Sequence, residues 1–297
     1  RLALLPSWGW SDKNVVKIRT LMLPAILGVS ASQLNLLVNT VLASFLSTGA
    51  ISYLYYSDRL LEFPIGIFAV AISTVILPAL SKVDKKEDPL RYKKTLEWGV
   101  KIVLLLGIPS MAGLISLREP LIRVIFMRGA FTQDHVLLSS ASLLASASGL
   151  AAIMLVRVLV QGFAAIQDTK TPVRCSLCAI GSNIIFNLIL IVPLGYVGLA
   201  LSTALAAYVN AALLILFLYK RKIYTISFDL ISFVLKISVS ACIMYAVVRY
   251  LSPSPDIWFS MNTLTSSLYL GALISLGALV YLVICLLVGI KPRTLKM

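Results

Sequence analysis

Long apolar runs separated by short basic loops constrain this chain more than any other feature. The run from Ile65 to Leu80, for example, contains no charged residue. A helix needs about 20 apolar residues to cross a bilayer, and it satisfies its own backbone hydrogen bonds there. The sequence is 59% hydrophobic and 13% charged, with a mean hydropathy of +0.95, which excludes an ordinary soluble domain. It predicts an all-α, polytopic membrane protein.

The pattern predicts eight spans. They cover about residues 18–47, 51–80, 96–117, 137–165, 173–192, 197–219, 230–250 and 264–290, with a short interfacial helix at Arg118–Gly129. In this layout eighteen Lys and Arg residues fall on one side and four on the other. Basic loops remain cytoplasmic, so we expect both ends of this segment to be cytoplasmic. Because the chain starts with Arg1, we expect it to be part of a longer protein.

The second span begins with a charged segment, Tyr55–Pro64, which organises the rest of the site prediction. On a helical wheel one face carries Ser52, Tyr55, Arg59, Glu62 and Gly66, with Asp58 at its edge, and the opposite face carries Leu54, Leu61, Ile65 and Phe68. Charges at membrane depth cost at least about 2.5–3.5 kcal/mol each, so they normally face a bundle interior or a wet cavity. Arg59 has the donor geometry that suits phosphate. The alternative is a structural Arg59–Glu62 ion pair that locks two helices.

Other polar residues lie inside predicted spans or at their ends. Arg157 lies in the fourth span, where it is either a cavity cation or the partner of a carboxylate on the second span. Asn183 and Asn187 are one helical turn apart in the fifth. Asp168 and Lys170 are interpreted as loop-capping residues.

The sequence offers little for catalysis, cofactors or nucleic acid. His135 is its only histidine, and no catalytic or phosphate-loop motif is visible. We therefore predict that the protein is not an enzyme and uses no cofactor or metal. The net charge of +14 lies mainly in the loops, as topology signals do, so nucleic-acid binding is not predicted.

The segment Tyr55–Pro64 resembles the Y-Y-A-D-R-L-x-E-F-P motif of the MurJ (MviN) lipid II flippases. Further matching segments are Pro24–Ser30, Leu77–Ser81, Gly162–Phe163 and Gln167–Pro172. The resemblance runs over nearly the whole chain. It implies the carboxyl-terminal half of a transporter of the MOP superfamily, with a six-helix lobe at residues 1–222. Two additional helices at residues 223–297 would form a groove for the lipid tail.

The resemblance also implies roles for residues. Those matching Asp58, Arg59, Glu62 and Ser52 line the family's central cavity, where the arginine is thought to contact the substrate pyrophosphate. Arg157 stands where relatives have a cavity lysine. Sodium-binding relatives use positions that correspond to Asn183, Asn187 and Thr203. Asn187 replaces an aspartate there, which removes an anionic ligand.

The function predicted from residues and resemblance is flipping of lipid II, the undecaprenyl-pyrophosphate-linked peptidoglycan precursor, across the bacterial cytoplasmic membrane. Its partners would be lipid II, membrane lipids and an amino-terminal lobe of the same protein. One alternative is transport of another polyprenyl-pyrophosphate saccharide, or export by a MATE-like protein. An alternative from another class is a non-transporting scaffold for cell-wall synthesis.

Overall fold

The computed structural model describes residues 12–83, 88–225 and 227–290. In these residues the secondary structure is helical and contains no strand, so the all-α prediction is confirmed. The elements are α1 (Lys13–Ser44), α2 (Ala50–Pro64), the π-helix η1 (Ile65–Val70), α3 (Ala71–Ser81), α4 (Pro89–Ser116), α5 (Arg118–Phe126), α6 (Gln133–Ala147), α7 (Leu150–Ala165), α8 (Lys170–Leu194), α9 (Tyr196–Lys220), α10 (Phe228–Leu251), α11 (Pro255–Ser260) and α12 (Thr263–Leu287).

The predicted spans correspond to these helices. Among the described residues, six helical segments are long and apolar enough to cross a membrane, and the bent pair α6–α7 makes a seventh if it is one span. They coincide with the second to eighth predicted spans, and α1 coincides with the first. The predicted interfacial helix is α5, which ends at Phe126 rather than Gly129. The predicted polar lead-in at 1–11 and the basic residues after 290 lie outside the described residues.

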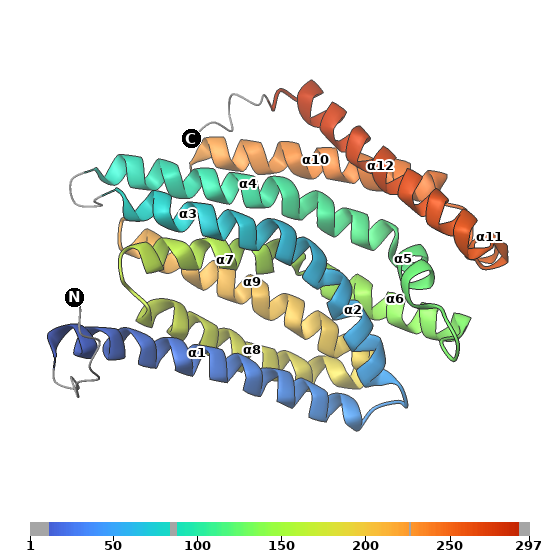
Figure 1. The fold of residues 1–297 in the computed structure, drawn as a ribbon, viewed down its shortest axis with the longest axis horizontal. Coiled ribbons are helices and arrows are strands. Elements are labelled where there is room, and N and C mark those ends of the chain that lie inside the picture. The colour runs from blue at the N-terminus through green and yellow to red at the C-terminus, as the bar shows by residue number, and fades with distance from the viewer. Residues whose placement is uncertain (1–11, 84–87, 226, 291–297) are drawn as a thin grey trace, which may run out of the picture.

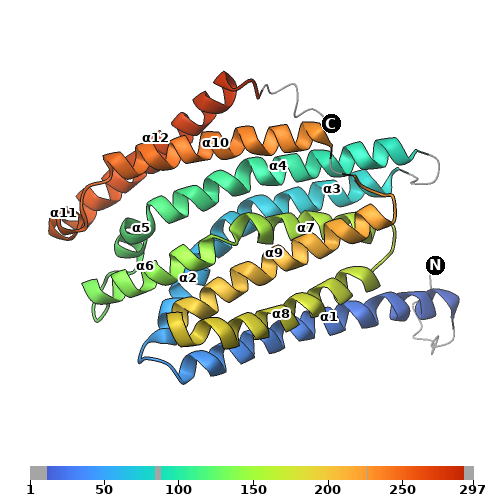
Figure 2. The same cartoon turned by 180° about the vertical axis from the view of Figure 1, so that it is seen from behind.

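Figures 1 and 2 show an elongated bundle of helices that run side by side. The helices α1 and α8 lie along one edge, and α10 and α12 lie along the opposite edge. Between them, α2, α3, α4, α6, α7 and α9 share a hydrophobic core in which Leu96, Met154 and Phe163 are fully buried. This core fixes the helix faces that point outward.

The helices α10–α12 have a second core, which they share with α4 and α5. Its members include Ala112 of α4, Ile237 and Met244 of α10, Trp258 of α11 and Leu273 of α12. The α10 helix packs along α4 and α12. The described part of the chain after residue 222 thus attaches to the lobe through α4 and α5, and the division into 1–222 and 223–297 stays a prediction.

The fourth predicted span is broken, whereas the sequence predicts a continuous one. The α6 and α7 helices meet at an angle of 41°. A Cβ atom at Gly149 would lie 2.6 Å from the Ala204 Cα atom of α9, so only glycine allows this close approach. The Tyr208 hydroxyl donates a 2.7 Å hydrogen bond to the Ser148 carbonyl oxygen and so supplies that carbonyl at the break with a partner.

The second span is continuous but contains a π-helical turn after Pro64. Proline has no N–H group to donate to the preceding turn, which favours a local irregularity there. Beyond η1, Ile72, Ile76 and Leu80 are buried at four-residue spacing. The polar face of α2 is thereby followed by a helix whose inner face packs against α4 and α7.

The basic loops meet at one end of the bundle. The connections α3–α4, α7–α8 and α9–α10 lie together there (Figure 1). Lys82 and Arg221 lie in the first and last of them, and Lys170 begins α8 directly after the second. We call this the basic end. The α1–α2 turn, α5 and α11 lie at the other end. Grouping of basic loops is what the predicted topology requires, while the side of the membrane stays a prediction.

Candidate functional site

The polar face of α2 is exposed. Ser52, Tyr55, Asp58, Arg59, Glu62 and Gly66 are all exposed, whereas Leu61 is buried and Leu54, Ile65 and Phe68 are half-buried. A Cβ atom at Gly66 would meet nothing within 4 Å. The lengthwise division of this helix is therefore confirmed.

Arg59 and Glu62 form an ion pair within this face. Arg59 Nη1 lies 2.7 Å from Glu62 Oε2, and the two side chains are 50% and 62% exposed. The guanidinium also lies 4.7 Å from the centroid of the Tyr55 ring. Both partners belong to α2, so the pair does not lock two helices as the structural alternative required. Exposed pairs contribute only about 0–1 kcal/mol to stability.

A buried serine holds the back of the same helix. The Ser57 hydroxyl lies 2.9 Å from the Tyr53 carbonyl oxygen and 3.1 Å from the Ser139 carbonyl oxygen of α6. This contact between α2 and α6 fixes the rotation of α2 about its axis. Asp58 and Arg59 follow directly, so the contact also sets the direction in which they point.

A cavity of about 300 Å³ lies between α1, α2, α6 and α9. Its lining includes Asp58 and Tyr55 from α2, Asn35 and Asn39 from α1, and Thr203 from α9. The structure therefore brings two predicted site residues, Asp58 and Thr203, to one cavity. The lining does not include Ser52, Arg59, Glu62 or Arg157.

An amide cluster joins α1, α8 and α9 beside this cavity. Asn187 Nδ2 donates hydrogen bonds to Asn39 Oδ1 at 2.7 Å and to Asn183 Oδ1 at 3.2 Å. Asn39 Nδ2 in turn donates to Thr203 Oγ1 at 3.4 Å. The three residues proposed from the resemblance as an ion site thus lie together, with Asn39 as the link.

The cluster holds neutral oxygen atoms rather than carboxylates. Asn187 Oδ1, Asn183 Nδ2 and Asn35 Oδ1 are buried and have no hydrogen-bond partner in the described part of the chain. Buried amides normally find partners, so the two oxygens favour a bound water or a weakly held cation, and the Asn183 nitrogen favours a water that accepts its hydrogen. A hard cation is held tightly by ionised carboxylates, which the hydrogen-bonded cluster lacks.

Asn35 and Asn39 are not among the predicted site residues, although they belong to a polar series on the first span whose side chains suit bonds between helices or a wet path. They lie one turn apart on α1, the same spacing as Asn183 and Asn187. This repeated spacing is a visible signal, but only the fold shows that Asn39 of one pair meets Asn187 of the other.

Arg157 lies apart from these contacts. It is exposed on α7, and within residues 12–83, 88–225 and 227–290 it has no hydrogen bond or ion pair. The interpretation of Arg157 as partner of Asp58 or Glu62 is therefore not supported by this structure.

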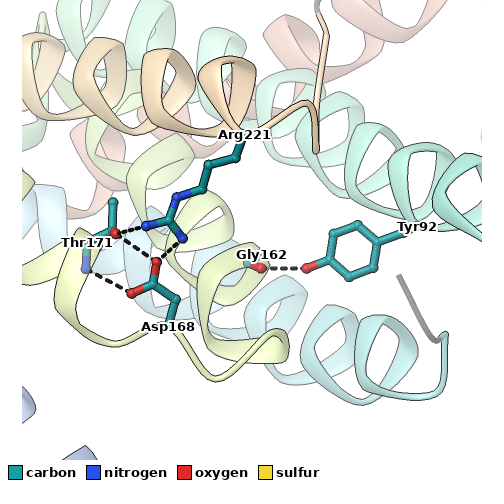
Figure 3. Close-up of polar contacts among 5 residues, drawn as sticks. All are labelled: Tyr92, Gly162, Asp168, Thr171 and Arg221. Carbon is teal, nitrogen blue, oxygen red and sulfur yellow. Dashed lines mark hydrogen bonds and ion pairs between the residues drawn. The ribbon is translucent and has the colours of Figure 1, made fainter. Parts of the chain in front are cut away.

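A second polar cluster lies at the basic end (Figure 3). Asp168 accepts hydrogen bonds from the Thr171 amide at 3.1 Å and the Thr171 hydroxyl at 2.7 Å, and it forms an ion pair with Arg221. Arg221 also donates to Thr171 Oγ1 at 2.8 Å. Burial acts to raise the pKa of Asp168, but the bonds from Thr171 and the charge of Arg221 outweigh it and lower that pKa.

This cluster fastens the start of α8 to the end of α9. On the other side of the α7 end, the Tyr92 hydroxyl of α4 donates to the Gly162 carbonyl oxygen. The capping role predicted for Asp168 is confirmed. Lys170 is exposed, and the structure gives it no polar contact among the described residues.

The helical bundle has a fold that is also found in transporters of the MOP superfamily. A MATE transporter in the straight conformation superposes with a TM-score of 0.61 at 16% identity, over 79% of this chain and 54% of that chain. A multidrug resistance MATE transporter of the MOP superfamily in an outward-facing conformation gives 0.56 at 17% identity, over the same shares. At these identities the likeness shows the fold alone.

The family is defined more narrowly by sequence. The family model described as "Lipid II flippase MurJ" matches residues 1–269. The solved structure "Lipid II flippase MurJ, inward closed conformation" is similar, with a TM-score of 0.75 and 32% identity over 88% of this chain and 52% of that chain. This chain belongs to the lipid II flippase MurJ family.

Curated relatives agree with this placement. A probable lipid II flippase MurJ of Vibrio cholerae is 47% identical over 98% of this chain and 55% of that protein. The corresponding protein of Haemophilus influenzae is 44% identical over 99% of this chain and 59% of its own length. The chain thus spans a little over half the length of these relatives. Family and apolar helices together indicate a multi-pass protein of the inner membrane.

Proposed function

We propose that this chain is the carboxyl-terminal part of a flippase that carries lipid II across the cytoplasmic membrane. The observation that supports this most is the polar face of α2, on which Arg59 and Glu62 are exposed although α2 belongs to a membrane-spanning segment. Such groups are costly against lipid, so this face requires a wet cavity or a charged ligand. The relatives named as lipid II flippases supply the identity of the ligand.

Arg59 is proposed to bind the substrate pyrophosphate. A guanidinium offers paired donors that match phosphate oxygens. The pairing with Glu62 engages one of its terminal nitrogens, Nη1, and Tyr55 lies over the guanidinium. Glu62 would hold Arg59 in position before substrate arrives. Asp58, Ser52 and Arg157 are proposed to line the same pathway.

The exposed face of α2 needs a second protein surface opposite it to form a closed cavity. A second lobe of the same protein would supply it and enclose the cavity between the two lobes. Rocking of the lobes would then expose the site first to one side of the membrane and then to the other. In this arrangement the basic end is cytoplasmic, as are both ends of the segment, and the protein transports its substrate without catalysing a reaction.

The amide cluster is proposed as a structural and weak ion-binding element rather than a tight sodium site. Asn183, Asn187 and Thr203 would order the α1–α8–α9 contact through Asn39. The neutral oxygens of this cluster give a cation little electrostatic stabilisation. Energy coupling through a tightly bound sodium ion is therefore not part of this proposal.

A binding and flipping comparison tests the function. Purified full-length protein is offered lipid II, another undecaprenyl-pyrophosphate saccharide and undecaprenyl pyrophosphate alone, and movement of each is then followed in proteoliposomes. We expect binding and flipping of lipid II above the other two. Equal handling of all three would favour a general polyprenyl-pyrophosphate carrier. Normal cell-wall growth with an Arg59→Ala protein would favour the scaffold alternative.

A further inference from the structure

A second cavity, of about 390 Å³, lies at the basic end, where α10 begins and α12 ends. Lys101 of α4 lines one side, and Asp229 and Lys236 of α10 line another. The remaining wall is the turn at Gly289 and Ile290. Gly289 has a φ of 88°, a left-handed conformation that favours glycine, and it folds the chain back so that Ile290 is buried in the second core.

Only some of the charged side chains around this cavity have ion-pair partners. Lys101 pairs with Glu97 at 2.8 Å, and the Ser227 hydroxyl donates to the same carboxylate at 2.9 Å. Lys236 and Asp229, in contrast, form no ion pair with each other or with any other described residue. The cavity therefore presents one unpaired cation and one unpaired anion.

The spacing of these two charges suits a ligand with two opposite charges. Lys236 follows Asp229 by seven positions, which places them on one face of α10 about 10 Å apart along the helix axis. The first turn of a helix favours the anion of Asp229 in any case. The helix end gives Lys236 no comparable stabilisation, because Lys236 lies two turns further into a membrane-spanning helix.

The side chains beside the cavity suit the hydrocarbon chains of a lipid. On α10, Val239 and Ile243 follow Lys236 by three and seven positions, so they lie on its side of the helix, and they are 52% and 38% exposed. On α12, Leu282 and Leu286 are 61% and 59% exposed. These side chains offer an apolar surface next to the charged cavity. A ligand that has a charged head and hydrocarbon chains would contact both.

We propose that this cavity binds the headgroup of an aminophospholipid, a glycerophospholipid whose phosphate is linked to a primary ammonium group. The phosphate would accept a charge-assisted hydrogen bond from Lys236, the ammonium would donate to Asp229, and the acyl chains would lie along α10 and α12. The four charged side chains around the cavity sum to zero, so a headgroup that is only anionic would meet Asp229 without compensation. The site is separate from the α2 face proposed for the transported substrate, and it would join α10 and α12 to the lobe through a resident lipid.

Lipid binding to the purified full-length protein tests the proposal. Native mass spectrometry is used to count bound lipids at increasing concentrations of phosphatidylethanolamine, phosphatidylglycerol and phosphatidylcholine with identical acyl chains. We expect phosphatidylethanolamine to bind most tightly, because only its headgroup offers both a phosphate and an ammonium that can donate hydrogen bonds. Transport is not the readout, so failure here leaves the proposed function untouched.

Three variants locate the site. Lys236→Gln should weaken phosphatidylethanolamine binding by about tenfold, the effect of losing one charge-assisted hydrogen bond. Asp229→Asn should reduce the preference for phosphatidylethanolamine over phosphatidylglycerol. Lys222→Gln, which removes an exposed charge at the same end but outside the cavity, is the matched control and should change neither.

A variant that fills the cavity gives an independent test if Lys236→Gln lowers protein yield. Ser232→Leu places a bulky side chain on the cavity wall and leaves both charges in place. It should also reduce phosphatidylethanolamine binding. The proposal is overturned if phosphatidylglycerol binds the unaltered protein as tightly as phosphatidylethanolamine, or if neither Lys236→Gln nor Ser232→Leu reduces retention.

Discussion

Asn187 donates a 2.7 Å hydrogen bond to Asn39, which lies 148 positions earlier in the sequence. The bond joins α8 to α1 at the edge of the bundle, where α1 has few other neighbours than α8. The same Asn187 nitrogen also contacts Asn183. Two neighbouring oxygen atoms therefore converge on one amide donor.

This convergence predicts the effect of Asn187→Asp. A carboxylate would face Asn39 Oδ1 and Asn183 Oδ1 without a hydrogen to share, so the variant should be less stable by about 1–3 kcal/mol in sodium-free buffer. Sodium would restore it, and saturation at about 100 times the Kd would return about 2.7 kcal/mol. Thermal unfolding in sodium and in choline chloride measures both effects.

The control for this experiment is Asn210→Asp, which changes an asparagine of α9 that lies outside the amide cluster. It should show no sodium-specific stabilisation. The unaltered protein should show only a small stabilisation by sodium. Identical unfolding temperatures of Asn187→Asp in both salts would contradict the cation-site geometry.

Arg59→Ala should abolish flipping and leave the amount of protein in the membrane near normal, because an exposed pair contributes little to stability. Arg59→Lys should retain little or some activity, since an ammonium cannot replace paired guanidinium donors. Flipping in proteoliposomes, normalised to protein amount, is the measurement. Arg249→Ala is the matched control, because it removes an exposed arginine in the last turn of α10, outside the proposed substrate site.

The double variant Arg59→Met with Glu62→Gln separates the two roles of this pair. If the pair were only structural, removal of both charges together would restore folding and activity. With a substrate-binding Arg59, the double variant should accumulate normally and fail to flip. Near-normal flipping by a well-expressed double variant would refute substrate binding by Arg59.

Asp168→Asn should destabilise the basic end, since Arg221 would lose its ion-pair partner. We expect a loss of about 1–3 kcal/mol at neutral pH. The lowered pKa of Asp168 means that its stabilisation is present above its unfolded pKa of about 3.9 and is lost as pH falls through the lower folded value. Thermal unfolding between neutral pH and pH 3 should thus show a smaller acid effect in the variant. Asp256→Asn, at the other end of the bundle, should keep the full acid effect.

Topology is tested with single cysteines in a variant that lacks the four native ones, of which Cys178 and Cys242 are exposed. Lys220→Cys should react with an impermeant thiol reagent only after the cells are permeabilised. Ser254→Cys should react in intact cells. The reverse pattern at Ser254 would contradict the eight-span arrangement with a cytoplasmic basic end.

Expression of residues 1–297 alone should give a membrane-inserted chain that cannot replace the full-length flippase. Alternating access needs a second lobe against which this one rocks, and the exposed α2 face indicates where that lobe would lie. Growth of a flippase-depleted strain on this segment alone is the measurement. Rescue would contradict the two-lobe proposal, provided that the segment is shown by immunoblot to be in the membrane.

The apolar runs were sufficient to predict the positions of the helices, and the helical wheel of the second span was sufficient to predict the polar face of α2. Both depend on local periodicity, which every helix of the bundle must obey. The break at Ser148–Gly149 was not predictable, because it depends on the approach of Ala204 from another helix. The π-helical turn after Pro64 was not predicted either.

The sequence by itself determined that this chain is a helical membrane protein with Arg59 and Glu62 on one face, because hydrophobicity and helical spacing are local properties. Tertiary structure alone decided that Asn39 meets Asn187, that Asp58 shares a cavity with Thr203, and that Asp168 is held by Arg221. These contacts join different helices, and which helix faces meet depends on the packing of the whole bundle. No spacing along the chain contains that information.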